Sequence, residues 1–211
     1  MNKDEIVNYL NKIISNPVCE LNYSKDYELL ISVMLSAQST DKRVNKVTEE
    51  LYNKYSNIYL LNEASVKEIE TIIKPIGTYK RKSFYIKEIV ANLIKDWDGR
   101  VPRDRNYLEQ LPGIGRKSTN VVLAELYNLP TIAVDTHVTR ISKRLGLANE
   151  NDSVRKIEEK LMKIFPQKDW NKINHQLILF GRYYCKARNP DCENCLLKKD
   201  CIRTKKETVK N

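Results

Sequence analysis

Residues 111–135 read LPGIGRKSTNVVLAELYNLPTIAVD, and the rest of the chain is interpreted around this stretch. It opens with a tight turn in which Gly113 and Gly115 flank one apolar residue. Glycine lets the backbone turn sharply and approach another molecule closely. Residues 104–110 before the turn and 116–127 after it have the apolar spacing of helices. The sequence therefore predicts two helices joined by a short hairpin.

The hairpin is a candidate phosphate-binding site. Backbone N–H groups in the first turn of a helix have no partner within the helix, and they attract anions. Contacts of this kind hold nucleic acid without reading its sequence. The candidate residues are Gly113, Ile114, Gly115 and Arg116. A lone turn of this composition also fits an ordinary loop between two packed helices, so the turn alone does not decide its function.

Composition limits the class of protein. The chain has 211 residues, with 37 Lys and Arg against 27 Asp and Glu, which gives a formal net charge of +10. A basic chain often has a nucleic-acid partner, but charge alone does not separate it from a basic protein without one. No apolar run approaches the roughly eighteen residues of a membrane span. The opening residues MNKDEIVNYL lack an apolar signal segment. We therefore expect a cytoplasmic protein without a membrane partner, associated with the nucleoid in a bacterium.

Apolar residues recur with helical spacing along the whole chain, and no useful stretch alternates with the period of a strand. Further helices are predicted at residues 4–15, 66–74, 79–94, 153–165 and 170–184, with others opening at Asp26, near Val44 and after Asp135. The length is sufficient for a real apolar core. The pattern therefore predicts an all-α protein of about ten helices.

Four of the five cysteines form a cluster near the C-terminus. Cys185, Cys192, Cys195 and Cys201 have the spacing C-x6-C-x2-C-x5-C. Four thiolates this close together can hold zinc or a 4Fe–4S cluster, whereas two disulfides suit an intracellular chain poorly. One CxxC is present instead of the two in a zinc ribbon, but spacing alone does not decide between zinc and iron.

Taken together, these motifs resemble the endonuclease III family of helix-hairpin-helix (HhH-GPD) DNA glycosylases. SAQSTD, LPGIGRK, VDTHVTR, LILFGRYYC and the four cysteines stand in the family's order, so the resemblance covers nearly the whole chain. It implies a two-lobed helical fold: a six-helix domain at residues 20–130 and an iron–sulfur domain from residues 1–19 and 131–211. It also implies a 4Fe–4S cluster on the four cysteines and a monomeric protein.

The resemblance implies an enzyme of base excision repair that is both a DNA glycosylase and an AP lyase. Its partner would be double-stranded DNA that contains oxidised pyrimidines or abasic sites. Lys117 would attack the sugar C1′ and form a Schiff base that permits β-elimination, and Asp135 would be its paired carboxylate. From position alone, Lys117 also fits a phosphate-binding lysine, and Asp135 fits the N-cap of the following helix.

The resemblance implies DNA contacts for residues outside the hairpin. Gln38, within SAQSTD, would enter the space left by a flipped nucleotide, and Lys186 and Arg188 would meet phosphates. Thr78 stands where the family usually has a leucine wedge. This departure puts the wedge in doubt, so we expect the gap to be filled by Gln38 more than by Thr78.

Two other functions fit parts of the same sequence. A non-catalytic helix-hairpin-helix protein could use the same basic surface to sense DNA damage. The other alternative is a protein-interaction module whose fold is held together by a structural zinc ion. The pairing of Lys117 with Asp135 favours the enzyme over the sensor, and a 4Fe–4S cluster would give a yellow-brown protein where zinc would give a colourless one.

Overall fold

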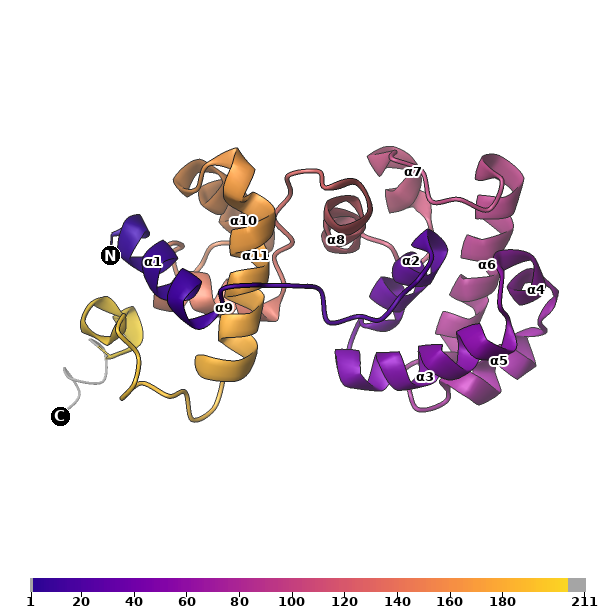
Figure 1. Cartoon of the computed structure of the whole chain (residues 1–211), viewed down its shortest axis with the longest axis horizontal. Helices are drawn as coiled ribbons and strands as arrows, with labels where there is room; N and C mark the ends of the chain where they lie inside the picture. The colour runs from indigo at the N-terminus through magenta and orange to yellow at the C-terminus, as the bar shows by residue number, and fades with distance from the viewer. Residues whose placement is uncertain (1, 205–211) are drawn as a thin grey trace. The chain divides into compact units, whose positions relative to one another are not determined.

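A computed structural model describes residues 2–204, which contain eleven α-helices and no β-strand (Figure 1). The helices are α1 (Lys3–Ile13), α2 (Asp26–Leu35), α3 (Asp41–Lys54), α4 (Ile58–Glu63), α5 (Val66–Ile73), α6 (Tyr79–Trp97), α7 (Arg105–Gln110), α8 (Arg116–Tyr127), α9 (Thr136–Arg144), α10 (Val154–Ile164) and α11 (Trp170–Leu179). A π-helix, η2 (Phe180–Tyr184), continues α11 directly. The short 3-10 helices are η1 (Gln167–Asp169) and η3 (Lys198–Asp200). The predicted all-α class is confirmed.

The chain divides into two compact units. One consists of Met1–Cys19 together with Asn128–Asn211, and the other of Glu20–Tyr127. The domains expected from the sequence, 20–130 and 1–19 with 131–211, divide the chain at nearly the same places. That each behaves as a domain in solution stays a prediction.

The unit of residues 20–127 is built around α2. Every residue of this helix after Asp26 is buried, which is the pattern of a helix enclosed on all sides. It packs against α3, α6 and α8, while α4 and α5 cover other parts of α6. Because α6 and α8 both contact α2, the loops at the ends of these three helices are held by one core.

The unit formed by the two ends of the chain has a separate core. Helix α1 packs against α11, and α9 packs against α10, α11 and η2. Its largest fully buried side chain is Phe180, and the ring of Tyr9 meets it edge-on with the centroids 6.0 Å apart. The N-terminal helix is therefore part of the same core as the C-terminal third.

Two local features differ from the sequence-based expectation. Helix α4 was not predicted, because its six residues are too few to show helical periodicity; Asn57 begins it by accepting a hydrogen bond from the backbone of Leu60. The long helix expected at residues 170–184 changes to π geometry at Phe180. Apolar spacing does not distinguish an α-helix from one π turn.

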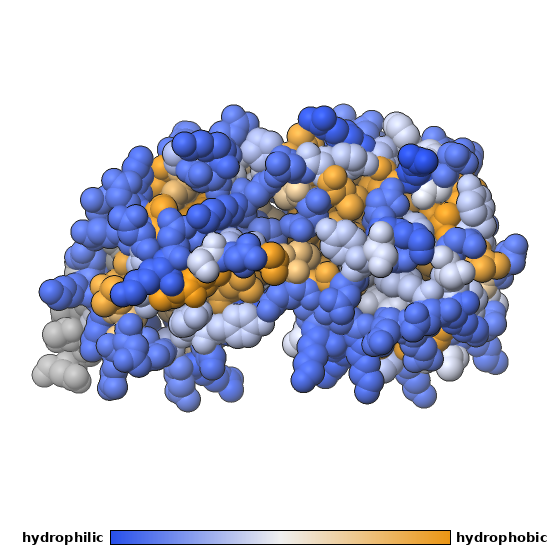
Figure 2. All heavy atoms as spheres, viewed as in Figure 1, coloured by the Kyte–Doolittle hydropathy of each residue, from blue (hydrophilic) through white to orange (hydrophobic). Residues whose placement is uncertain are grey.

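Across residues 2–204, no helix is both long and apolar enough to cross a lipid bilayer. Hydrophilic residues cover most of the face drawn in Figure 2, with apolar residues visible between them in small patches.

Candidate active site and metal centre

The hairpin between α7 and α8 is fixed by polar contacts on its first helix. Asp104 caps α7 by accepting hydrogen bonds from the backbone N–H groups of Asn106 (2.9 Å) and Tyr107 (3.1 Å). Arg105 donates to Asn120 of α8 (2.7 Å) and also pairs with Glu109 on its own helix. These contacts tie the two helices of the hairpin together, and they occupy Glu109 in a structural ion pair.

The two glycines of the turn have different surroundings, so glycine suits each position for a different reason. Gly113 has a φ of +75°, and a Cβ there would lie 2.8 Å from the ring of Tyr85 and 3.1 Å from Met34. A Cβ at Gly115 would meet no atom within 4 Å. The fold itself therefore explains Gly113, whereas Gly115 lies at an open surface that another molecule can approach.

Only part of the predicted phosphate site offers free donors. The side chain of Ile114 is buried, and its N–H donates to the carbonyl of Leu111 (3.1 Å). In the part of the chain that the structure describes, the N–H groups of Gly113 and Gly115 donate no hydrogen bond. Ile114 therefore anchors the turn, while the N–H groups of the two flanking glycines are available to an anion.

Lys117 lies in the first turn of α8, with its side chain partly exposed. Its ammonium forms no hydrogen bond or ion pair with any of residues 2–204. A lysine next to the open turn, without an internal partner, is available to react with or bind an external group.

Gln38 and Thr78 lie on neighbouring loops of the same unit. Both side chains are exposed, and both backbones have a φ of +58°. The carbonyl oxygen of Gln38 lies 3.8 Å from the position a Cβ would take on Gly77, the residue before Thr78. The two residues that the sequence placed at the gap of a flipped base thus come from adjacent turns.

Asp135 lies in the other unit, at the start of α9. Its carboxylate accepts a hydrogen bond from the backbone of Val138 (2.8 Å), so it is the N-cap of the helix. The extended segment before it is pinned to α11, because the Asn174 side chain donates to the carbonyl of Ala133 and accepts from its N–H. The capping role predicted for Asp135 is present, and sequence patterns gave no sign of the support from Asn174.

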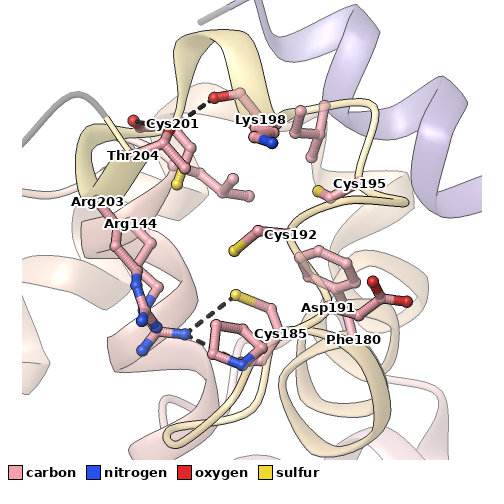
Figure 3. A pocket seen from close by; sticks show the side chains of 13 residues that line it. Arg144, Phe180, Cys185, Asp191, Cys192, Cys195, Lys198, Cys201, Arg203 and Thr204 are labelled. Atoms are coloured by element: carbon pink, nitrogen blue, oxygen red, sulfur yellow. Dashed lines mark hydrogen bonds between the residues drawn. The ribbon is translucent and has the colours of Figure 1, made fainter. Parts of the chain in front are cut away.

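The four clustered cysteines line one pocket, and Figure 3 shows their sulfur atoms around a common space. Leu197, Phe180 and Leu145, the residue that follows α9, contribute apolar lining. Burial raises the pKa of the Cys195 thiol. Among residues 2–204, no three His, Cys, Asp or Glu side chains are grouped to hold one metal ion.

Two arginines of α9 hold the loop that begins at the first of these cysteines. Arg144 donates to the Sγ of Cys185 (3.2 Å) and to the carbonyls of Cys185, Lys186 and Ala187. Arg140 donates to the carbonyls of Gly181 (2.6 Å) and Cys185 (3.3 Å). Sequence reasoning missed both arginines, although their i, i+4 spacing places them on one face of α9.

Other predicted residues have simpler surroundings. Lys186 and Arg188 are exposed on this loop. The Nδ1 of His137 lies 3.2 Å from the guanidinium of Arg140, so this histidine is part of the contacts that hold α9 against the cysteine loop. Burial, followed by the charge of Arg144, lowers the pKa of Arg140.

The fold and the hairpin define a class of helical DNA repair proteins. Residues 31–167 match the model of the HhH-GPD superfamily of base excision DNA repair proteins. Endonuclease III of Bacillus subtilis (strain 168) is 45% identical over 192 residues, 91% of this chain and 88% of the relative. Endonuclease III of Escherichia coli (strain K12) is 43% identical over 204 residues, 95% and 96% of the two chains.

A solved structure gives the same result. A trapped endonuclease III–DNA covalent intermediate, an estranged-adenine complex, is similar to this chain with a TM-score of 0.92 and 44% identity over 99% of each chain. The chain belongs to the endonuclease III family within the HhH-GPD superfamily. It is a base-excision-repair DNA glycosylase with AP lyase activity.

Proposed function

We propose that the protein removes oxidised pyrimidines from double-stranded DNA and cleaves the resulting abasic site, with Lys117 as its nucleophile. The observation that carries this proposal is the position of Lys117. This residue follows an open glycine turn, and its ammonium has no partner within residues 2–204. A related enzyme has been trapped as a covalent intermediate with DNA. A lysine amine is one of the nucleophiles that can form such a link, because it gives a Schiff base with a carbonyl carbon.

The reaction begins when the neutral Nζ of Lys117 attacks the sugar C1′. The glycosidic bond breaks, and the electron pair leaves with the base. Loss of a proton from the nitrogen leaves Nζ bonded to C1′ of the closed sugar. The ring then opens: the C1′–O4′ bond breaks, O4′ takes a proton, and a Schiff base forms between Nζ and C1′. Removal of a C2′ proton next breaks the C3′–oxygen bond by β-elimination, so the strand is cut without a metal ion in the reaction.

Asp135 is the proposed partner of Lys117 in the reaction. Its carboxylate helps to deprotonate the amine, and its negative charge stabilises the positive charge that develops on the sugar. The N-cap hydrogen bond to Val138 and the support that Asn174 gives to Ala133 favour this role. The first orients the carboxylate and the second holds the backbone that leads to it, and neither neutralises its charge.

Gln38 is proposed to fill the space that the flipped nucleotide leaves, with Thr78 beside it. Flipping costs a few kcal/mol of stacking and pairing. A positive φ is tolerated by asparagine and aspartate but is an outlier for a β-branched residue such as Thr78. Backbone strain of this kind persists at functional sites, and here it coincides with the two residues that the sequence placed in the gap.

The hairpin and the basic loop are proposed to grip the DNA backbone. The free N–H groups of Gly113 and Gly115 suit a phosphate oxygen, and Arg116 adds charge beside them. On the loop after Cys185, Lys186 and Arg188 are exposed and reach solvent. None of these contacts requires a particular base, which suits an enzyme that must search undamaged DNA.

Cys185, Cys192, Cys195 and Cys201 are proposed to hold a 4Fe–4S cluster. All four thiols line the same pocket, and their spacing follows the endonuclease III pattern. An all-cysteine set leaves no open ligand position, so the group is structural and fixes the loop that carries Lys186 and Arg188. Residues of the active site proposed above lie elsewhere and need no metal for their chemistry.

Borohydride trapping tests the proposed nucleophile. The protein is incubated with duplex DNA that carries an oxidised pyrimidine, and borohydride reduces any Schiff base to a stable covalent adduct. Lys117→Gln should give no adduct while still binding the DNA. Arg116→Gln, one residue away in the same turn, is the matched control and should still form the adduct with weaker binding.

A trapped adduct at wild-type yield with Lys117→Gln would show that another amine is the nucleophile. Loss of the adduct in both variants, together with loss of DNA binding, would instead assign Lys117 to phosphate binding. Strand cleavage that requires an added metal ion would contradict the Schiff-base route.

A further inference from the structure

Lys82 of α6 is buried, and no carboxylate among residues 2–204 pairs with it. Only 4% of the surface of Lys82 is exposed to solvent. Its Nζ donates to two backbone carbonyls, those of Leu35 (2.9 Å) and Ala37 (2.6 Å). Burial, with Arg81 nearby, lowers the pKa of this lysine. Burying an ammonium is costly unless its hydrogen bonds are satisfied, so this position has a purpose that an apolar residue would not serve.

The two acceptors show what the ammonium holds. Leu35 is the last residue of α2, and Ala37 immediately precedes Gln38. Lysine near a helix C-terminus satisfies carbonyls that have no partner in the helix. Lys82 therefore ends α2 at a fixed place and sets the direction in which the chain enters Gln38.

The same residue also holds the neighbouring turn. The backbone N–H of Lys82 donates to the carbonyl of Thr78 (3.1 Å), which closes the first turn of α6. Thr78 is itself the left-handed N-cap of that helix and has no capping side-chain bond to it. One residue thus contacts Gln38's loop through its side chain and Thr78's turn through its backbone.

A reason to hold these two turns lies in their backbone conformation. Five residues other than glycine have a positive φ among residues 2–204, namely Gln38, Thr78, Asp98, Asn128 and Asn189. Three of the five are Asn or Asp, which adopt this conformation readily. Gln38 and Thr78 do not, so surrounding contacts must impose it. The charged hydrogen bonds of Lys82 are contacts of the required strength.

We propose that Lys82 is a positioning residue for base flipping. It locks the Gln38 loop and the Thr78 turn in one geometry before DNA arrives, so that Gln38 enters the gap without first being ordered. Lys82 does not itself touch DNA. The inference rests on the proposed gap-filling role of Gln38.

The test compares paired with pre-opened DNA. Single-turnover excision of an oxidised pyrimidine is measured in a fully paired duplex and in a duplex where the lesion lies in an unpaired bubble. Lys82→Met keeps the length and the apolar stem but removes both hydrogen bonds. We expect excision from paired DNA to slow about tenfold, because Gln38 must then be ordered during flipping. Excision from the bubble should stay near the wild-type rate, because there the lesion is already unpaired and no partner base is left to recapture it.

Two further variants keep the result interpretable. Lys80→Met removes an exposed charge from the same helix and should leave the ratio of paired to bubble rates unchanged. Lys82→Gln retains a donor and should recover part of the lost rate. Cleavage of a preformed abasic site serves as the measure of intact folding and chemistry.

The outcomes distinguish failure of this inference from failure of the gap-filling role proposed for Gln38. An equal loss by Lys82→Met on paired, bubble and abasic DNA would make Lys82 merely structural and overturn the inference. A normal rate for Lys82→Met with a slow Gln38→Ala would do the same while preserving the role of Gln38. A normal rate for Gln38→Ala on paired DNA would refute gap filling itself. If both proposals hold, the double variant Lys82→Met with Gln38→Ala is little slower than Gln38→Ala.

Discussion

At the scale of single residues, the two hairpin glycines offer a matched comparison. Gly115→Ala meets open space and has no positive φ to oppose it, so the fold should be kept and even stabilised by about 0.4–1 kcal/mol. The added methyl group would still obstruct a phosphate, so DNA binding should weaken. Gly113→Ala should instead destabilise the fold, because its Cβ would collide with Tyr85 and the φ of +75° is unfavourable for alanine.

Thermal melting and DNA titration of the two variants check this contrast. If Gly115→Ala bound DNA as tightly as the wild type, the open side of the turn would not be the phosphate site. If Gly113→Ala melted at the wild-type temperature, the turn would be able to accommodate a Cβ despite the short distance to Tyr85.

Asp135 combines capping with a proposed catalytic charge, and one substitution separates them. Asp135→Asn keeps a side-chain oxygen for the N–H of Val138, and Asn caps as well as Asp, so stability should change little. The charge that stabilises the sugar cation is lost. We expect base excision to slow by about a hundredfold or more, as for other groups that stabilise transition-state charge, with a smaller loss on a preformed abasic site. Equal losses on both substrates, with a lower melting temperature, would assign Asp135 to capping alone.

Residue types predicted local interactions well, whereas they did not predict the tertiary contacts. The cap at Asp135 and the turn at Gly113 follow from rules that act within a few residues, and both are present. The burial of Ile114, the carbonyls held by Lys82 and the support from Asn174 join residues far apart in the chain. No pattern in one sequence reports such contacts, because they depend on how the helices pack.

At the scale of elements, α9 supports the cysteine loop through a planar guanidinium. Arg144 reaches three carbonyls and one sulfur at the same time, and a lysine at this position offers a single point of donation. Arg144→Lys should therefore leave carbonyls unsatisfied and loosen the loop. The expected result is a lower iron content after purification and a lower melting temperature, by roughly 4 °C for each 1–2 kcal/mol lost.

Lys143→Gln is the matched control for Arg144→Lys, since it changes the neighbouring charge on α9 without touching the loop. Iron analysis of the two variants in parallel decides the matter. Equal iron in both would mean that the cysteines organise the loop by themselves.

Helices with clear caps were the most predictable elements. Ser65 and Glu68 form the capping box that opens α5, and Ser153 caps α10, so these boundaries follow from local hydrogen bonding. Helix α4 and the π-helix were missed for different reasons. The first is too short for periodicity, whereas apolar spacing does not separate a π turn from an α-helix. Within the π-helix, Gly181 lies so close to α9 that a Cβ there would be 2.9 Å from His137.

At the scale of the whole molecule, the four cysteines are all found in the unit that joins the two ends of the chain. Leu197, between Cys195 and Cys201, is part of that unit's apolar core, and Cys185 and Cys195 pack against the same core. A ligand on the thiols therefore stabilises this core, because metal binding in a small site is coupled to folding. The core around α2 contains none of the four cysteines.

Cys192→Ser should thus affect the two units unequally. We expect loss of the visible absorbance and of iron, which the wild-type protein should contain at about four atoms per chain. Hydrogen exchange should rise in η2 and around Leu197, while α2 and the hairpin helix α8 keep their protection. Cys19→Ser, which changes the one cysteine outside the cluster, should retain its iron. Zinc at about one per chain without iron would refute the cluster, and equal deprotection of α2 would show that the two cores unfold as one.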